Sequence, residues 1–196
     1  EGLHQGAVIV DCSTALPDST VRMGVAVNDA GCAYIDAPMT RTAKHAHKGQ
    51  LNLLIGGDAD VLEKVRPVLA SFTESIAHVG ALGNGHRLKL LHNYVSIGFM
   101  TLLAEAAAQA ADGGVDPQVF VDVLADGGGA SAALDRLAPF IIEGNRDGLP
   151  FFVANAQKDI DYYRAMSDAS GAQKTIADNV YAAISTVVES GHGQAY

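Results

Sequence analysis

The sequence has no tryptophan and only six tyrosines and six phenylalanines, so its core must be built mainly from smaller apolar side chains. Basic residues are also scarce. The 13 lysines and arginines stand against 22 aspartates and glutamates, which gives a formal net charge of −9. Because nucleic-acid backbones are bound by clustered lysine and arginine, this balance argues against a nucleic-acid partner. It does not exclude a small anionic ligand, which needs only one or two local cations.

Cysteine occurs only twice, as Cys12 and Cys32, and neither belongs to a Cys-x-x-Cys motif. Two cysteines are too few for a disulfide framework, so we expect a reduced, cytoplasmic protein. We find no signal peptide at the start of the sequence. The longest apolar run, residues 94–104, is shorter than the roughly 20 residues that cross a bilayer, so we expect a soluble protein without a membrane partner.

Apolar residues make up 48% of the 196 residues, enough for a sizeable core. In the first half, short β-branched runs alternate with segments of helical character. Strands are predicted at residues 7–11, 33–36, 52–55 and 75–79, and helices at 17–30 and 58–70, with a short helix after residue 42. Asp18 or Ser19 is predicted to cap the first helix, and Asp58 the second. The β-α-β-β-α-β order predicts part of an α/β sheet.

From Gly85 onward the strand signals disappear. A long, mostly apolar helix is predicted at residues 86–112, followed by helices at 116–125, 131–143, 153–168 and 172–190. A helix that is apolar on most faces must be buried all round, and in so small a domain this predicts packing against a second copy of the chain. The predicted boundary separates residues 1–82, the α/β part, from residues 83–196, an all-helical substrate and dimerisation domain.

The α/β half begins abruptly for a nucleotide-binding sheet, which normally opens with a strand, a glycine-rich turn and a helix. No Gly-x-Gly-x-x-Gly occurs anywhere in the sequence. Gly83-Asn84-Gly85 lacks the third glycine and follows the strands instead of opening them. Either the protein does not bind a nucleotide, or the chain lacks the beginning of such a domain.

Lys89 and Asn93 stand four residues apart on the long predicted helix, so they share one face about one turn apart. Lys89 lies in the run Leu-Lys-Leu-Leu on a helix with few charges. A buried ammonium loses solvation and its pKa falls, which makes a lysine usable as a proton donor near neutral pH. Asn93 would orient the lysine or bind a substrate hydroxyl. The alternative is a lysine whose ammonium only reaches out to water from a buried helix.

Residues 36–42, Asp-Ala-Pro-Met-Thr-Arg-Thr, stand where a strand ends and a short helix begins. Ligands gather at the carboxyl ends of strands in open α/β sheets. Thr40, Arg41 and Thr42 offer hydroxyls, backbone N–H groups and a guanidinium at one helix start, which favours the binding of an anion. The alternative is a solvated loop whose threonines only cap the helix.

The histidines are weaker candidates. His45 and His47 are near each other, but no cysteine or third histidine stands at ligand spacing, so we expect no metal site. His86 and His92 lie off the helix face that carries the lysine, and we interpret each as a core or interface histidine with its hydrogen bonds satisfied.

Four motifs, in this order, resemble the β-hydroxyacid dehydrogenase family. Asp11-Cys-Ser-Thr14 is similar to its nicotinamide-side D-x-S-T, and residues 36–49 to its substrate-binding D-x-P-V-S-G-G…G. Gly83-x-Gly-x-x-x-Lys89-x-x-x-Asn93 is similar to its catalytic G-x-G-x-x-x-K-x-x-N-N. Phe151…Lys158-Asp159 is similar to the F-x-x-x-x-x-x-K-D segment that closes over cofactor and substrate. The lysine motif with its glycines is the most specific of the four.

The resemblance implies an α/β remnant of a Rossmann-type dinucleotide-binding domain followed by an all-α domain. The glycine-rich half that opens family members is missing, roughly 90 residues if it holds three βα units. The implied function is an NAD- or NADP-dependent oxidoreductase that transfers hydride between nicotinamide and a small anionic β-hydroxyacid or its aldehyde. The implied assembly is a homodimer or homotetramer through the helical domain.

The resemblance also implies a role for each candidate site residue. Lys89 would be the general acid or base and Asn93 its catalytic partner. The substrate would be bound by Thr40, Arg41, Thr42 and Asp159, and the cofactor by Ser13, Thr14, Phe151 and Lys158.

Two positions depart from the family pattern. Thr40-Arg41-Thr42 replaces the usual Ser-Gly-Gly and resembles the branch that includes sulfolactaldehyde reductase. His92 replaces the first of the two asparagines. The guanidinium of Arg41 predicts a more demanding anion than a methyl-branched acid, a sulfonate first and a polyhydroxy carboxylate second. The alternative is that Arg41 points to solvent and pairs with Asp36 or another surface acid.

Two alternatives to an active dehydrogenase remain open. The chain could be a non-catalytic dimerisation fragment that lacks the cofactor half. It could also be an imine-reductase-like enzyme, although that group usually carries a different residue at the lysine position.

Overall fold

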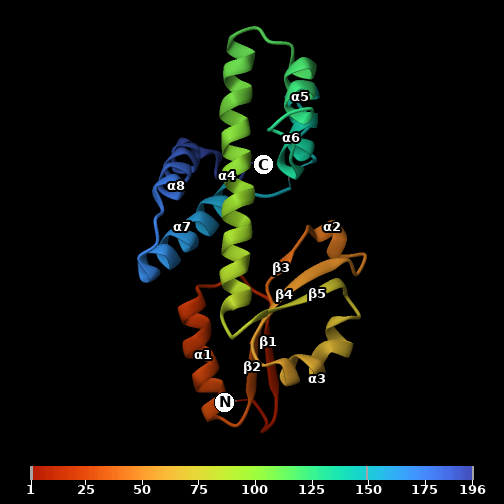
Figure 1. The fold of residues 1–196 in the computed structure, drawn as a ribbon, viewed down its shortest axis with the longest axis vertical. Coiled ribbons are helices and arrows are strands. Elements are labelled where there is room, and N and C mark those ends of the chain that lie inside the picture. Colours follow the sequence, from red (N-terminus) through yellow and green to blue (C-terminus); the bar gives the residue numbers. More distant parts are fainter. Residues whose placement is uncertain (1, 149, 196) are drawn as a thin grey trace. The chain divides into compact units, whose positions relative to one another are not determined.

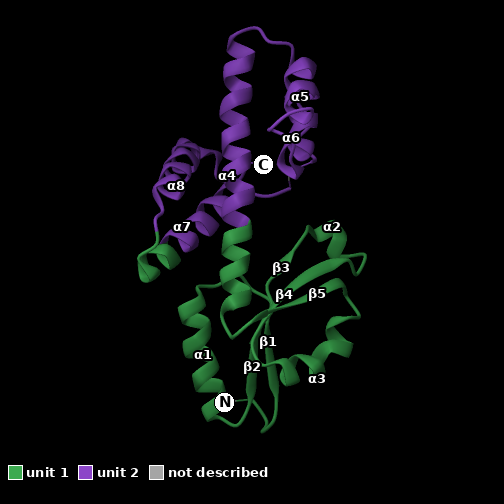
Figure 2. Ribbon diagram, in the orientation of Figure 1, with its two compact units in different colours: residues 1–92, 165–172 green, residues 93–164, 173–196 purple. Residues whose placement is uncertain are grey.

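The computed structural model describes residues 2–148 and 150–195. They form two compact units: residues 2–92 with 165–172, and residues 93–148 and 150–164 with 173–195. Figure 2 shows that the long helix α4 (Asn84–Asp112) and the helix α7 (Val153–Ser170) each contribute to both units. The division in space therefore falls inside α4, beyond the boundary at residue 82 predicted from the sequence.

The first unit is built on a five-stranded mixed sheet (Figure 1). The parallel strands β1 (Val8–Asp11) and β2 (Ala33–Asp36) are joined by the helix α1 (Pro17–Asp29). The strand β4 (Leu51–Gly56) is antiparallel to β2 and to the short strand β3 (Met39–Thr40). It is parallel to β5 (Thr73–Gly80), to which it is joined by the helix α3 (Ala59–Leu69). The four-residue helix α2 (Ala43–Ala46) lies between β3 and β4.

The predicted order of strands and helices, and the α/β class of this unit, are confirmed. The strand β3 was not predicted, because two residues have no periodicity to detect. It has a topological consequence. β2 and β3 both pair with β4 in the antiparallel sense, so the chain reverses after Thr40 and the sheet becomes mixed.

The sheet and α3 share the core of this unit. Its fully buried members are Ile35, Ala37, Leu53, Ile55, Leu62 and Leu69. Figure 1 shows α1 and α3 flanking the sheet on its two sides. The sheet is thus covered by helices, as expected for a dinucleotide-binding type of architecture.

Of the two helix caps predicted from the sequence, the cap of α3 is present and the cap of α1 is not. Asp58 caps α3 as predicted, since its carboxylate accepts from the N–H groups of Asp60 at 2.8 Å and Val61 at 3.1 Å. The predicted cap of α1 is wrong, because Leu16 occupies the cap position and makes no side-chain hydrogen bond. Pro17 starts this helix, so residues 18 and 19 fall inside its first turn.

A buried carboxylate joins the sheet to α4. Asp36, the last residue of β2, is 0% exposed. Its Oδ1 accepts from the Gly83 N–H at 2.8 Å and its Oδ2 from the His86 N–H at 2.7 Å. Both donors belong to the start of α4, where backbone N–H groups have no partner within the helix. Asp36 therefore acts as a cap supplied by the sheet.

Two glycines make this close approach possible. A Cβ on Gly56 would lie 2.3 Å from Asp36 Oδ1, and one on Gly85 would lie 2.7 Å from Asp36 Oδ2. Neither position can therefore hold a side chain without moving the carboxylate. Gly85 of the lysine motif is therefore required sterically, because any side chain there would collide with Asp36.

His86 adds a second connection at the same place. It is fully buried, its Nδ1 lies 2.7 Å from Thr20 Oγ1 of α1, and its Nε2 lies 3.2 Å from the Ser13 carbonyl oxygen. Because a carbonyl only accepts, Nε2 is the donor. His86 is thus the hydrogen-bonded core histidine that we predicted, and it links α4 to α1 and to the segment after β1.

The second unit is all helical. Besides parts of α4 and α7, it contains α5 (Pro117–Ala125), α6 (Ala132–Glu143), α8 (Thr175–Val187) and the π-helical turn η1 (Val188–His192). One buried cluster consists of Ile97, Ile160, Val180 and Ile184, and another of Leu103, Leu134 and Leu137. In Figure 1, α5 and α6 lie on one side of α4, and α7 and α8 lie on the other. The predicted all-α domain is confirmed.

One face of α4 is left uncovered by the residues that the structure describes. Val95 is 52% exposed, Phe99 46% and Leu102 65%, at the three- and four-residue spacing of one helix face. By length and composition alone α4 could cross a membrane. The same criteria are met by helices that pack against other helices, so they do not identify what covers this face.

Replacing Asp36 with alanine should lower the free energy of unfolding by about 2–6 kcal/mol, because two buried N–H groups would lose their acceptor at about 1–3 kcal/mol each. Urea unfolding of the chain measures this loss. Asp58→Ala is the matched control, since it removes an exposed helix cap worth about 1 kcal/mol. Equal, small losses in both variants would show that Asp36 is not an anchor.

Candidate active site

Asp11 organises the segment that follows β1. Its Oδ1 accepts from the Ser13 N–H at 2.9 Å, and its Oδ2 accepts from the Tyr34 hydroxyl at 2.6 Å. These bonds hold Ser13 and Thr14 directly beyond the carboxyl end of β1. Ser13 is exposed, and Thr14 is half-buried.

Contacts within the segment set the protonation states of Asp11 and Tyr34. Burial alone would raise the pKa of Asp11, but the hydrogen bonds from Ser13 and Tyr34 outweigh it and the pKa is lowered. Burial and the bond to Asp11 raise the pKa of Tyr34. At neutral pH Asp11 is therefore an ionised acceptor and Tyr34 a neutral donor, which keeps the Ser13 segment in one arrangement.

The turn after β3 holds the three residues predicted to bind an anion. Arg41 Nη1 donates to the Gln50 carbonyl oxygen at 3.0 Å and forms an ion pair with Glu74 of β5. This arrangement matches the alternative in which Arg41 pairs with a surface acid, with Glu74 in that place instead of Asp36. A role in substrate binding remains a prediction.

The threonines beside Arg41 have different surroundings. Thr40 is buried, at 9% exposure. Thr42 occupies the cap position of α2, but its side chain caps no backbone N–H there. Its hydroxyl instead lies 2.9 Å from His45 Nδ1.

The backbone of Arg41 is left-handed, with a φ of 78°, and Arg41 is the one non-glycine residue with positive φ in the described part of the chain. This conformation costs an L-residue about 1–2 kcal/mol, whereas glycine adopts it freely. The family pattern has glycine here, so the chain keeps the backbone of a glycine turn while adding a guanidinium. The contacts with Glu74 and Gln50 hold the side chain in place.

Lys89 is half-buried, and its neighbours along α4 differ in burial. Leu90 is fully buried, but Leu88 is 38% exposed and Leu91 39% exposed. The role of Lys89 as an acid or base remains a prediction. Its assignment depends on the motif and on its place one turn after the anchored start of α4.

Asn93 and Asp159 form a buried pair in the second unit, although 66 residues separate them. Asn93 Nδ2 donates to Asp159 Oδ2 at 2.6 Å, and the two residues are 8% and 3% exposed. An ionised carboxylate only accepts, so Asp159 fixes which way the Asn93 amide faces.

The other oxygen of Asp159 is a buried acceptor without a hydrogen bond. Lys158 Nζ lies 3.0 Å from this Oδ1, near enough for an ion pair, but not in the direction of a hydrogen bond. The Lys158 side chain is 47% exposed and also lies 5.5 Å from the centre of the Tyr162 ring. Asp159 is thus buried although its ion-pair partner Lys158 is half exposed, and Oδ1 is an acceptor that a ligand hydroxyl could use.

The structure therefore brings some predicted residues together and leaves others apart. Asn93, Lys158 and Asp159 form one cluster, whereas Phe151, 45% exposed, lies before the start of α7. Among the described residues, no group of three or more histidines, cysteines, aspartates or glutamates could hold a metal ion.

Several contacts were missed by sequence reasoning. Tyr34 and Glu74 carry no motif, and their partners lie 23 and 33 residues away in the chain. The sequence singles out Asp11 and Asp36 as the first residues of their motifs, and Asp36 also as a possible partner of Arg41, but not as acceptors of backbone N–H groups. Their position at strand ends could have indicated this role, because a carboxylate there can accept hydrogen bonds from backbone N–H groups of the next element.

Comparisons with known proteins match both halves of the chain. Residues 1–80 match the family described as the NAD binding domain of 6-phosphogluconate dehydrogenase. Residues 83–195, more than half of the chain, match the family described as NAD-binding of NADP-dependent 3-hydroxyisobutyrate dehydrogenase. The chain belongs to the β-hydroxyacid dehydrogenase family.

Individual members of this family are similar over long segments. A 2-(hydroxymethyl)glutarate dehydrogenase of Eubacterium barkeri is 33% identical over 144 residues, which are 73% of this chain and 48% of that protein. A 3-sulfolactaldehyde reductase of Escherichia coli is 37% identical over 107 residues, 55% of this chain and 36% of that protein. The chain spans about half the length of the curated relatives it matches.

Solved structures show the same fold. A 3-hydroxyisobutyrate dehydrogenase of Mycobacterium tuberculosis aligns with a TM-score of 0.89 and 25% identity, over 97% of this chain and 67% of that one. An imine reductase of Myxococcus stipitatus, 22% identical, aligns with a TM-score of 0.51 over 95% of this chain and 67% of that one, which is a likeness of fold only.

Proposed function

We propose that this chain carries the substrate-binding and acid–base residues of an NAD- or NADP-dependent dehydrogenase or reductase. Its substrates would be small anionic β-hydroxyacids or their aldehydes. The main observation is the position of Lys89 on α4. This lysine lies one turn after the start anchored by Asp36 and His86, and one turn before the buried Asn93–Asp159 pair. Membership of the β-hydroxyacid dehydrogenase family supports the same reaction class.

The residues at the end of β1 suit the nicotinamide end of a dinucleotide. Ser13 and Thr14 offer hydroxyl and backbone groups in a segment that Asp11 holds in one arrangement. Such groups complement an amide and ribose hydroxyls. No glycine-rich phosphate turn occurs in the sequence, so these residues do not account for binding of the pyrophosphate. Phe151 and Lys158 would contribute from the second unit.

When bound, the dinucleotide supplies the hydride chemistry. The chain's own part is to move the accompanying proton. Lys89 Nζ would give a proton to the substrate oxygen in reduction and take it in oxidation. Asn93, whose amide is oriented by Asp159, would hold that oxygen close to the lysine.

Substrate recognition would use two kinds of group. Asp159 Oδ1, buried and without a hydrogen bond, would accept from a substrate hydroxyl. At the turn after β3, Arg41 would hold the acid group together with Thr40 and Thr42. Arg41 Nη1 is engaged by Glu74 and Gln50, which leaves the Nε and Nη2 edge of the fork to pair with two oxygens of one anion. This geometry suits a sulfonate or a carboxylate.

The exposed apolar face of α4 supports a second proposal, that two copies of the chain pair through the helical domain. Val95, Phe99 and Leu102 form an unpartnered apolar stripe, and an isologous contact would bury the same stripe on both copies. The partner is therefore a second copy of the chain, as a homodimer or within a homotetramer.

In the full-length protein, Lys89→Ala should lower kcat by a factor of about 10² or more, the usual contribution of a general acid. Cofactor affinity should change little, because the lysine acts on the substrate oxygen. Steady-state kinetics and a cofactor titration measure the two effects. Lys64→Ala, which removes an exposed lysine of α3, is the control. A Lys89→Ala enzyme that keeps most of its turnover would exclude the assignment.

Arg41→Ala should lower kcat/KM on the best anionic substrate about 30- to 1,000-fold, the effect of losing one charged hydrogen bond worth roughly 2–4 kcal/mol. Arg41→Gly separates charge from strain, because glycine relieves the left-handed backbone. Both variants should lose activity, while Arg41→Gly should be the more stable of the two. If kcat/KM is unchanged in both, Arg41 serves only to pair with Glu74.

Sedimentation velocity at micromolar concentration should show a dimer or a larger closed assembly of the chain. Leu102→Asp places a charge in the α4 stripe and should shift the chain toward the monomer. Val68→Asp, at a 67% exposed position on α3, should not. A compact monomer for the unaltered chain would rule out this assembly.

A further inference from the structure

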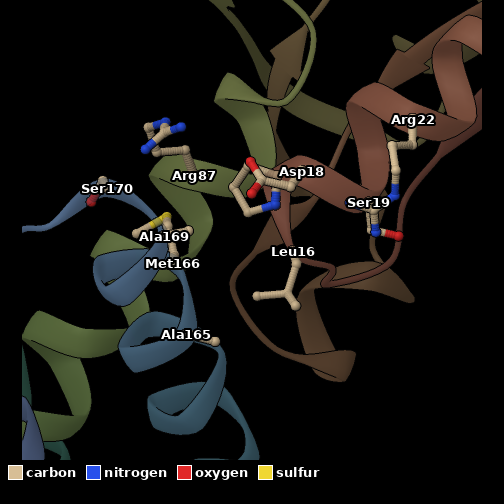
Figure 3. Close-up of a pocket in the computed structure, with 10 residues that line it drawn as sticks. Leu16, Asp18, Ser19, Arg22, Arg87, Ala165, Met166, Ala169 and Ser170 are labelled. Atoms are coloured by element: carbon tan, nitrogen blue, oxygen red, sulfur yellow. The ribbon is translucent and has the colours of Figure 1, made fainter.

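A cavity of about 250 Å³ lies within the first unit, formed by the first turn of α1, the start of α4 and the last turns of α7. We refer to it as the rear cavity and define it by Asp18, Ser19, Arg22, Arg87, Met166 and Ser170 (Figure 3). Arg87 precedes Lys89 by two residues on α4. Because successive residues are about 100° apart around a helix, the two side chains leave α4 in roughly opposite directions. The rear cavity is therefore separate from the proposed catalytic groups.

Two guanidinium groups line this cavity from different elements. Arg22 comes from α1 and Arg87 from α4, and Figure 3 shows them at two ends of the opening. Within residues 2–148 and 150–195, neither arginine has an ion pair or a hydrogen bond to an acid. Asp18 lines the same cavity and is four residues before Arg22 on α1, a spacing at which surface pairs often form. The three charges nevertheless remain unpaired.

The rest of the lining is mixed. Leu16 and Met166 supply an apolar wall, and Met166 is only 9% exposed. Ser19 and Ser170 supply hydroxyls. The first turn of α1 has no side-chain cap, so its N–H groups add to the positive character of this wall. The net charge of the two arginines and Asp18 is +1.

The charged, polar and apolar groups that line the rear cavity favour one class of ligand. The planar guanidinium fork pairs with the two oxygens of a carboxylate. A carboxylate on the protein repels a second anionic group but accepts from a hydroxyl or an ammonium. A short carbon chain between these two ends would contact Leu16 and Met166. The volume is below that of ordinary cofactor pockets, roughly 300–1,000 Å³, and suits a molecule of a few carbons.

We propose that the rear cavity binds a small organic carboxylate that also carries a hydroxyl or ammonium group, with the guanidinium of Arg22 or Arg87 on the carboxylate and Asp18 on the donor. This site is independent of the proposed catalytic function, since none of its residues occupies a fixed position of the four family motifs, although Arg87 lies at a variable position of the lysine motif. Its ligand class overlaps with that of the proposed substrates, so the experiment must separate the two sites.

The test uses the 196-residue chain, glycerate as the hydroxylated probe and propionate as the probe of equal carbon number without hydroxyls. In amide-resolved NMR titrations, glycerate should shift the amides of Ser19 and Ser170 saturably. Arg22→Gln or Arg87→Gln should weaken this binding about tenfold or more, the effect of losing one charge-assisted hydrogen bond, and the variant that does so identifies the arginine on the carboxylate. Both arginines are exposed, so the variants should fold, which thermal melts would check.

Two further variants identify the site and its selectivity. Asp18→Asn should reduce the preference for glycerate over propionate while propionate still binds. Arg41→Gln should leave the shifts of Ser19 and Ser170 unchanged, because Arg41 belongs to the proposed substrate turn. Absence of saturable shifts with either probe would overturn the proposal. So would glycerate shifts that persist in the Arg22→Gln, Arg87→Gln double variant or disappear in Arg41→Gln.

Discussion

The carboxylate of Asp36 is the contact on which the rest of this structure depends. It is fully buried at the end of β2, and both of its oxygens accept backbone N–H groups from the start of α4. A buried charge of this kind is tolerated only where hydrogen bonds replace its solvation. Gly56 and Gly85 allow this close approach, and the two hydrogen bonds fix the start of α4 against the sheet. Lys89 lies one turn further along α4, so the same hydrogen bonds also fix the position of its backbone.

The elements were predictable from the sequence, and most of the contacts that position the site were not. Hydrophobic periodicity found the long helices and four of the five strands, because each repeats a pattern over several residues. The two-residue strand β3 has no such pattern. The Asn93–Asp159 bond joins residues 66 positions apart, and no local feature of either indicates the other. The motif resemblance named both residues, but only the fold shows that Asp159 is buried and orients the Asn93 amide.

Arg41 shows how a substitution in a functional turn depends on backbone and charge together. The turn holds the backbone of this residue in the left-handed conformation, which glycine adopts freely. For an arginine this conformation costs about 1–2 kcal/mol. The exposed ion pair with Glu74 offsets only part of this, since such pairs contribute roughly 0–1 kcal/mol. Stability alone therefore does not explain an arginine here. Strained residues that persist in this way cluster at ligand sites, which is why we interpret Arg41 as functional.

Arg22 and Arg87 are two of several cations that have no ion pair among the described residues, and their place around one cavity is what distinguishes them. With a net charge of −9, a cation on this surface has many acids to pair with. Lys174, Arg66 and Arg164 do pair in this way. Arg22 and Arg87 do not, although Asp18 lines the same cavity. Charges that remain separated around a hollow retain their attraction for a ligand, because no internal partner has to be displaced before the ligand binds. We therefore assign the proposed recognition of small anions to a few guanidinium groups, on a chain whose net charge of −9 disfavours anions elsewhere on its surface.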